Sequence, residues 1–245
     1  TLLYSTTEFT GTTSDFATAH IIAKRSTNGG HDWSEAVVLQ ETTGKLNVMS
    51  STLRYIDDPV TNEKRLALFY LQKDSFSELN AFLRLSKDEG ATWADPILVT
   101  PTPGYHVMNN DRIVQLSSGR LLAPVASSPD VQKDNHFRST CFISDDGGRT
   151  WRAGKAKVDY AKRGAMEPEI LELNDGRLLM HFRTQLGHIG AAYSDDGGET
   201  WSEPQSWGVR APEAPTTLRR IPSTGDLMLI WNDTFTEGEG HGGKR

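Results

Sequence analysis

This sequence has a single cysteine, no long apolar run and no excess of positive charge. Cys141 is the single cysteine among 245 residues, which excludes an intrachain disulfide and a metal cluster held by several thiolates. No apolar run approaches the ~18 residues that a membrane-spanning helix needs. Lys and Arg total 26 against 32 Asp and Glu, a formal net charge of −6, so nothing favours binding to nucleic acid or to an anionic membrane. We therefore expect no cofactor, no metal site, no nucleic-acid partner and no membrane span.

What the sequence does contain favours an all-β fold. It has 22 Gly, 11 Pro and 6 Trp, a mixture typical of many short strands separated by tight turns and unlike that of a helical bundle. All-β proteins of this length often form one domain around one core. We expect residues 1–245 to form a single domain.

One octapeptide recurs four times and organises the whole chain. Its template is Ser-x-Asp/Asn-x-Gly-x-x-Trp, and its copies cover residues 26–33, 86–93, 144–151 and 194–201. The copies begin 60, 58 and 50 residues apart. Four matches at such similar spacing indicate a structural repeat.

The residue types in this octapeptide suit a turn between two strands. Asp or Asn accepts hydrogen bonds from nearby backbone amides, Gly supplies the positive φ that a tight return needs, and Trp buries a large apolar face. The motif, called an Asp box below, is therefore expected to close a hairpin, and its acidic residues are expected to be structural. A calcium loop is the alternative, but the ligand spacing of a calcium-binding hand is absent.

A second repeat lies between the Asp boxes and consists of an apolar strand, a turn and another apolar strand. Its copies cover residues 112–124, 169–181 and 217–230, with a looser copy at 51–70. Each unit then has two hairpins and four strands, and four-stranded units repeated radially form a β-propeller. A β-helix or a sandwich is the alternative, which units of this length with two hairpins each disfavour.

The strand count predicts an incomplete propeller of about four to five blades. Residues 2–4 fit the second strand of a blade, and the sequence stops after the first hairpin of a later blade, before an Asp box. Because a propeller closes on itself to protect its edges, we expect the domain to continue beyond both ends of these 245 residues.

The Asp boxes resemble those of the sialidase (neuraminidase) superfamily, the BNR-repeat proteins that include the exo-α-sialidases of glycoside hydrolase family 33. The resemblance runs along the whole chain and implies a six-bladed β-propeller. The boxes alone say little about function, because sorting receptors, matrix proteins and other glycanases also carry them.

A sharper resemblance covers residues 167–183, EPEILELNDGRLLMHFR. Sialidases have a similar stretch, in which a Glu orients and polarises a nucleophilic Tyr and an Arg is one of three that bind the sialic acid carboxylate. The resemblance gives these roles to Glu167 and Arg183, although Met166 and His181 stand where the family usually has Asn. A Tyr suits this substrate because a carboxylate nucleophile would be repelled by the sugar's own carboxylate, and the planar fork of Arg bonds two oxygens at once. The simpler alternatives are a surface carboxylate and a strand-end ion pair.

The resemblance also assigns the acid/base catalyst and a further arginine. Asp15 lies 11 residues before the first Asp box, close to the family spacing for the Asp that protonates the leaving glycosidic oxygen and later activates water. An ordinary turn Asp in a Thr- and Ser-rich loop is the alternative. Arg245 stands where the third carboxylate-binding Arg would be. The first Arg and the Tyr nucleophile would lie outside the sequence, since none of its six tyrosines has a matching context.

Several other polar residues form a possible substrate cleft. Asn110, Asp111, Arg112 and Glu213 lie at blade starts, and His181 lies two positions before Arg183. Residues at the starts of blades tend to face the central cleft of a propeller, whereas a solvated polar loop is the alternative.

These observations lead us to expect a retaining exo-α-sialidase that releases terminal sialic (nonulosonic) acid, with a sialylated or other acidic glycan as its partner. A polysaccharide lyase acting on uronic acids is one alternative, and His106, His181 or His188 would then be candidates for its base. A non-catalytic glycan-binding propeller is the other. The resemblance also implies a secreted or periplasmic location.

Overall fold

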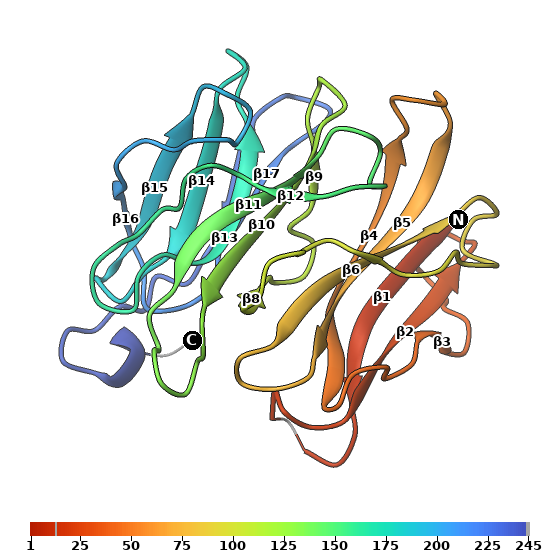
Figure 1. Ribbon diagram of the computed structural model, residues 1–245, viewed down its shortest axis with the longest axis horizontal. Helices are drawn as coiled ribbons and strands as arrows, with labels where there is room; N and C mark the ends of the chain where they lie inside the picture. Colours follow the sequence, from red (N-terminus) through yellow and green to blue (C-terminus); the bar gives the residue numbers. More distant parts are fainter. Residues whose placement is uncertain (13, 244–245) are drawn as a thin grey trace.

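The computed structural model describes residues 1–12 and 14–243, and in them the chain is built almost entirely from β-strands (Figure 1). The short 3₁₀ turn η1 (Gly240–Gly242) is the helical element of this part. The strands follow one another as successive antiparallel fans along the chain, from β1–β3 on the right of Figure 1 to β13–β16 on its left. The predicted all-β class is confirmed.

The strand bounds divide the chain into successive groups of three, four, five, four and two strands. The first fan holds β1 (Leu2–Phe9), β2 (Ala19–Ser26) and β3 (Val37–Gln40). The second holds β4 (Asn47–Asp57), β5 (Lys64–Lys73), β6 (Leu79–Ser86) and β7 (Ile97–Leu98). The third holds β8 (Tyr105–Val107), β9 (Val114–Gln115), β10 (Leu121–Ser128), β11 (Arg138–Ser144) and β12 (Arg152–Ala153). The fourth holds β13 (Met166–Glu172), β14 (Leu178–Arg183), β15 (His188–Ser194) and β16 (Gln205–Arg210), and the last pair is β17 (Thr217–Arg220) with β18 (Leu227–Ile230).

The predicted hairpins of the second repeat are present as four antiparallel pairs. They are β4–β5, β9–β10, β13–β14 and β17–β18. The second and third fans are joined by one parallel pair, Leu79 opposite Tyr105. The first Asp box follows β2 as the second follows β6, so β1 and β2 correspond to β5 and β6 of the second fan. The six-bladed closure stays a prediction.

Neighbouring fans pack face to face through alternate residues of the same strand. In β5 every residue from Leu66 to Leu71 is buried. Phe69 belongs to the core shared with the third fan, whereas Tyr70 belongs to the core shared with β2. Because successive side chains of a strand point to opposite faces, a strand between two fans reads as a continuous apolar run.

In all four Asp boxes the Ser hydroxyl donates to the Asp or Asn side chain and accepts from the Gly amide. Among the described residues, the Trp indole donates to the Gly carbonyl in the first and third boxes only. In the third copy the Ser144 hydroxyl donates to Asp146 (2.8 Å) and accepts from the Gly148 amide (2.9 Å), and the Thr150 hydroxyl donates to Asp146 (2.6 Å). The Trp151 indole donates to the Gly148 carbonyl (3.0 Å). The acidic residue of the box is thus engaged within its own turn, which agrees with the predicted structural role.

The boxes differ in how deeply their Trp is buried, and this gives a test. Trp151 is 8% exposed and meets Phe69 edge to face, whereas Trp33 makes the same indole–carbonyl bond but is 42% exposed. We expect Trp151→Ala to lower the free energy of unfolding by about 3–5 kcal/mol and Trp33→Ala to lower it by less than about 1 kcal/mol. Urea unfolding of the 245-residue chain measures both. Equal losses would show that the Trp acts within its turn and not by packing between fans.

Candidate active site

Glu167 and Arg183 lie at the end of the fourth fan that is opposite its Asp box. Met166, next to Glu167, pairs with Arg183 across β13 and β14. At the other end of the same sheet, Leu178 pairs with Ser194, the first residue of the Asp box. The turn motif and the candidate catalytic residues therefore occupy opposite ends of the fan.

The backbone at Glu167 is distorted in a way that re-aims its side chain. The pairing of β13 with β14 shifts between Met166 and Glu169, and Glu167 has a φ of 46°. A β-bulge changes the direction in which a side chain leaves the strand, and positive φ is uncommon for residues other than Gly. Such local strain is concentrated at functional sites in proteins.

Arg183 is held by two carboxylates. Its Nη1 donates to both Glu167 carboxylate oxygens at 3.0 Å, and its Nη2 lies 3.3 Å from Oε1 of Glu213. Glu213, which is buried, also pairs with Arg163 and accepts hydrogen bonds from Gln185 (3.0 Å) and His241 (2.9 Å).

The hydrogen-bond donors and the two arginines around Glu213 lower the pKa of its carboxyl. Burial alone would raise the pKa of its carboxyl, but the hydrogen bonds from Gln185 and His241 and the charges of Arg163 and Arg183 bring that pKa below its ordinary value. The lowered pKa favours the ionised form of Glu213, whose negative charge helps to hold the guanidinium groups of Arg163 and Arg183.

Asp15 reaches the same region from the loop between β1 and β2. Its backbone carbonyl accepts hydrogen bonds from the side chains of Asn47 (2.9 Å) and Lys73 (2.6 Å), while its side chain is exposed. The charge of Asp15 is felt by two buried neighbours. Burial, helped by this charge, raises the pKa of Tyr105 to about 12, and burial lowers the pKa of Lys73 to about 8 against the opposing effect of Asp15.

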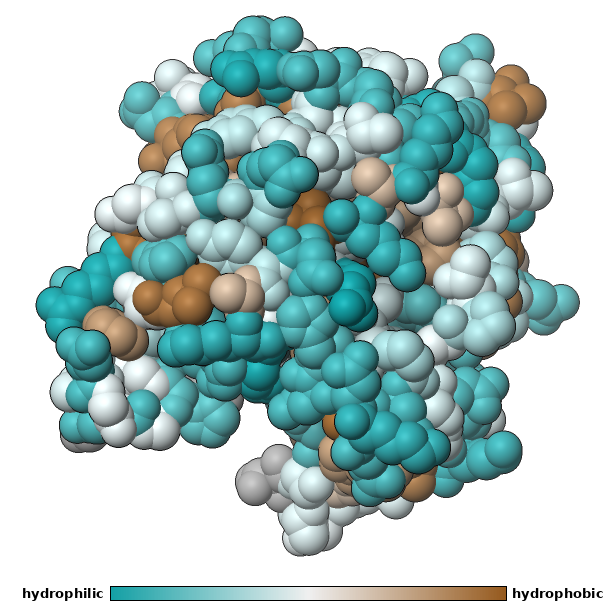
Figure 2. Space-filling view, turned by 60° about the vertical axis from the view of Figure 1, so that its left-hand side comes forward, coloured by the Kyte–Doolittle hydropathy of each residue, from teal (hydrophilic) through white to brown (hydrophobic). Residues whose placement is uncertain are grey.

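Asp15, Glu167 and Arg183 line one pocket of about 360 Å³. Their chain positions lie far apart, so the pocket is made by the packing of the fans and not by one loop. Apolar residues, among them Met49, Leu71 and Phe137, line the same pocket. The face of the molecule in Figure 2 is mainly hydrophilic and is hollowed between two lobes, with apolar residues showing only as scattered patches.

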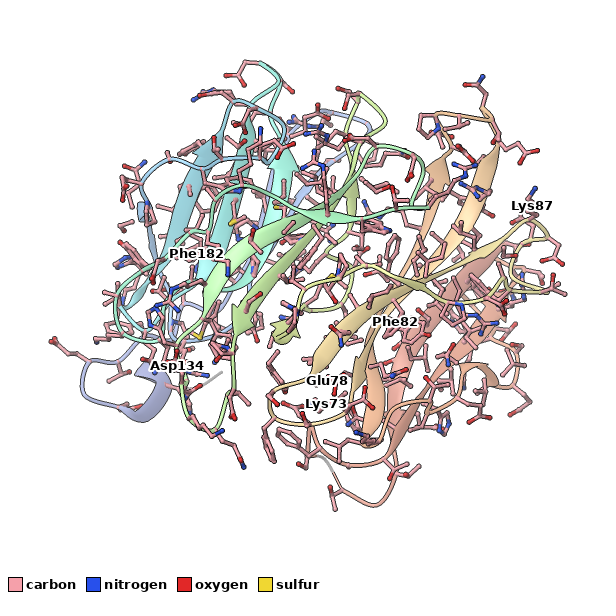
Figure 3. All side chains as sticks on the ribbon, in the orientation of Figure 1. Lys73, Glu78, Phe82, Lys87, Asp134 and Phe182 are labelled. Carbon is pink, nitrogen blue, oxygen red and sulfur yellow. The ribbon has the colours of Figure 1, made fainter. Side chains whose placement is uncertain are left out.

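Three ionisable residues that line this pocket were not singled out from the sequence: Lys73, Tyr105 and Arg163. Figure 3 labels Lys73 in the lower part of the molecule, close to Glu78 on the chain that leads into β6. The only signal for Lys73 in the sequence is its position as a lysine at the end of an apolar strand. Tyr105 is buried and holds its proton firmly, so it does not fit the role of the nucleophile.

The other predicted cleft residues lie away from this pocket. Asn110 and Arg112 line a neighbouring pocket of about 360 Å³, and Asp111 pairs with Arg54 and Arg219 at 2.8 Å each. Asn109 lines both pockets.

Arg112 and His181 are buried between β13 and its neighbours. Each contacts the carboxylate of Glu169, at 3.3 Å and 3.0 Å respectively. Burial lowers the pKa of His181 to about 3, and the charge of Arg112 acts in the same direction. His181 is therefore a neutral structural group that joins β14 to Thr216 through a 3.0 Å hydrogen bond.

Glu213 does not line the pocket of Asp15 but contacts Arg183, which does. Arg245 lies outside the described residues.

The histidines considered for a lyase do not converge on the pocket of Asp15. His106 is buried and bonded to Ser127 (2.8 Å) and to the Thr102 carbonyl (2.8 Å), and His188 contacts Tyr160. Within residues 1–12 and 14–243 no group of three or more His, Cys, Asp or Glu side chains is placed to hold a metal ion. No helix in this part is long and apolar enough to cross a membrane.

The buried ammonium of Lys73 predicts a specific pH dependence of stability. Because burial lowers the pKa of Lys73 from 10.5 to about 8, the unfolded chain holds a proton between these pH values that the folded chain has released. The free energy of unfolding should therefore rise with pH between about 8 and 10.5, and Lys73 should contribute about 3 kcal/mol to this rise. Below about pH 8 Lys73 is charged in the folded chain, and its burial lowers the free energy of unfolding by that full amount. Lys73→Met should remove that rise. Urea unfolding at several pH values between about 7 and 10.5 compares the two proteins, and an unchanged rise in Lys73→Met would contradict the assignment.

The sequence profile of the BNR repeat-like domain matches residues 5–240. The chain therefore belongs to the BNR repeat-like domain family, as the Asp boxes predicted.

Its curated relatives include several sialidases. A sialidase of Micromonospora viridifaciens is 30% identical over 206 residues, which are 74% of this chain and 31% of the relative. A sialidase of Bacteroides fragilis is 28% identical over 169 residues, 64% of this chain and 30% of the relative. The chain thus spans less than a third of these two relatives.

Solved structures share the fold. The NanB sialidase from Streptococcus pneumoniae superposes with a TM-score of 0.68 at 16% identity, over 93% of this chain and 54% of that one. An intramolecular trans-sialidase from Ruminococcus gnavus gives 0.69 at 17% identity, over 93% and 73%. At such low identity these likenesses speak for the fold alone, and they confirm a sialidase-like all-β architecture.

Proposed function

We propose that the pocket of Asp15, Glu167 and Arg183 belongs to the active site of a retaining exo-α-sialidase that releases terminal sialic (nonulosonic) acid from glycans. The observation that carries this proposal is that all three residues line one pocket, although Asp15 was selected from the sequence by a different motif from the one that gave Glu167 and Arg183. The relatives named sialidase support the same class of reaction.

Each residue has a role that its surroundings support. Arg183, kept rigid by Glu167 and Glu213, binds the carboxylate of the substrate through paired charge-assisted hydrogen bonds. Asp15 donates its proton to the glycosidic oxygen as the bond to the anomeric carbon breaks, and then accepts a proton from the water that completes hydrolysis. Glu167 accepts the proton of a Tyr nucleophile that bonds to the anomeric carbon.

The proposal requires groups that the 245 residues do not provide. We propose that the Tyr nucleophile and the first carboxylate-binding Arg come from parts of the same propeller outside this sequence, with Arg245 as the remaining member of the arginine set. The intact protein is therefore the one to assay.

Hydrolysis of a fluorogenic sialoside by the intact protein tests the reaction class. We expect release of the fluorophore together with free sialic acid. Absorbance of an unsaturated uronate from an acidic polysaccharide, with the sialoside untouched, would support a lyase instead. Glycan binding with neither reaction would support the non-catalytic alternative.

A further inference from the structure

Lys73 is a buried cation without an acidic partner. Its side chain is 1% exposed, and no carboxylate among residues 1–12 and 14–243 lies within ion-pair distance of its ammonium group. The Nζ atom donates instead to the backbone carbonyl of Asp15 at 2.6 Å, and it lies 4.1 Å from the ring centre of Phe16 and 5.8 Å from that of Tyr105. A buried and unpaired charge destabilises the folded protein, which suggests that Lys73 has a functional role.

Two of these contacts, with the Asp15 carbonyl and with the Phe16 ring, act on the loop that carries Asp15. The Asn47 side chain, from the strand beside Lys73, donates to the carbonyls of Asp15 (2.9 Å) and Ala17 (2.7 Å). Phe16 packs against Phe76 with ring centres 4.6 Å apart. The carbonyls of Asp15 and Ala17 are thus held from β4 and β5, and the Phe16 ring is held from the segment after β5.

The carboxylate of Asp15 shows the opposite situation. It is exposed, it lines the pocket, and it accepts no hydrogen bond from any described residue. A proton donor must be accurately placed but must also remain free to reach the leaving oxygen. Fixing the backbone while leaving the carboxylate free satisfies both requirements.

We propose that Lys73 is a positioning residue for Asp15, which anchors the main chain of the acid/base loop through its ammonium group. This inference rests on the proposed function for the identity of Asp15 as the acid. Lys73 touches no reacting atom and acts through the carbonyl of Asp15 alone.

The charged surroundings of Lys73 define what its replacement changes. Asp15 and Tyr105 are the titratable groups that face it, and Arg163, Glu167 and Arg183 line the same pocket from the fourth fan and the segment before it. Lys73→Met keeps the unbranched apolar stem and removes the ammonium group. The exposed Lys64 at the other end of β5 offers a matched control, Lys64→Met.

The test compares two sialosides that need acid catalysis to different degrees. A sialyllactose has an alkoxide leaving group that must be protonated, whereas an aryl sialoside with an acidic phenol leaves without help. In the intact protein, Lys73→Met should lower kcat for sialyllactose by about 100-fold and change kcat for the aryl sialoside by less than about 3-fold. Lys64→Met should change neither. Equal losses on both substrates, or no loss on either, would overturn the positioning role.

A second measurement follows the loop without any reaction. Hydrogen exchange of the amides of residues 14–17 should be about 10-fold faster in Lys73→Met than in the parent chain, while amides of β10 exchange at the parent rate. Unchanged exchange in the loop would overturn the anchoring role. If the parent protein cleaves neither sialoside, the proposed function fails, and exchange in the loop then decides the anchoring role alone.

Discussion

Replacing Glu167 by Gln should lower kcat of the intact protein for an aryl sialoside by about 10³-fold. The loss is expected because Gln cannot accept the proton of a Tyr nucleophile, while its size and shape keep the bulged strand intact. Arg183 would lose one of its anionic partners but keep Glu213 at 3.3 Å, so KM should change much less than kcat. Steady-state kinetics with a fluorogenic sialoside measures both constants.

Glu172→Gln is the matched control for this variant. Glu172 lies on the same strand, β13, but its carboxylate binds Ser117 at 2.7 and 2.8 Å, away from the pocket. It should leave kcat within about 2-fold of the parent. A Glu167→Gln protein that retains parental kcat would remove Glu167 from the chemistry and would leave it only an ion-pair partner of Arg183.

The second large effect is expected from Arg183→Ala. Loss of the paired charge-assisted bonds to the substrate carboxylate should lower kcat/KM by about 10²- to 10³-fold and should abolish measurable binding of free sialic acid. Calorimetric titration with sialic acid separates this loss from any defect in catalysis. The variant also leaves two carboxylates, Glu167 and Glu213, without a shared cation, so its unfolding transition must be checked first.

Arg177→Ala is the control that removes one positive charge outside the pocket. Arg177 lies in the β13–β14 turn, is half exposed, and pairs with Asp175 at 2.8 Å. Its replacement should leave sialic acid binding unchanged. If Arg177→Ala and Arg183→Ala weakened the binding of sialic acid equally, the net charge of the protein, and not direct hydrogen bonds from Arg183, would attract the ligand.

Most of the fold could be predicted because its determinants are local. Each Asp box is an eight-residue turn whose hydrogen bonds join residues at most four positions apart, such as Gly148 to Ser144. Each predicted hairpin likewise contains both of its strands within one short stretch. The relation of Glu167 to Arg183 was accessible for the same reason, since both belong to the hairpin of β13 and β14.

The remainder of the site depends on contacts between fans, which no local pattern contains. Lys73 meets Asp15 across 58 positions of the chain, and Arg163 meets Glu213 across 50. Arg112 and His181 illustrate the same difficulty. Both lie on strands or blade starts that sequence alone can assign, but whether such a side chain faces a cleft or a neighbouring fan depends on how the fans pack. Here both are buried around Glu169.

The central claim is that this pocket cleaves sialosides with retention, and proton NMR of the intact protein acting on a sialyllactose tests it most directly. We expect the α-anomer of free sialic acid to appear first and then to mutarotate, and we expect Glu167→Gln and Arg183→Ala not to produce it at a comparable rate. Absence of any cleavage by the intact protein, or first appearance of the β-anomer, would contradict this claim.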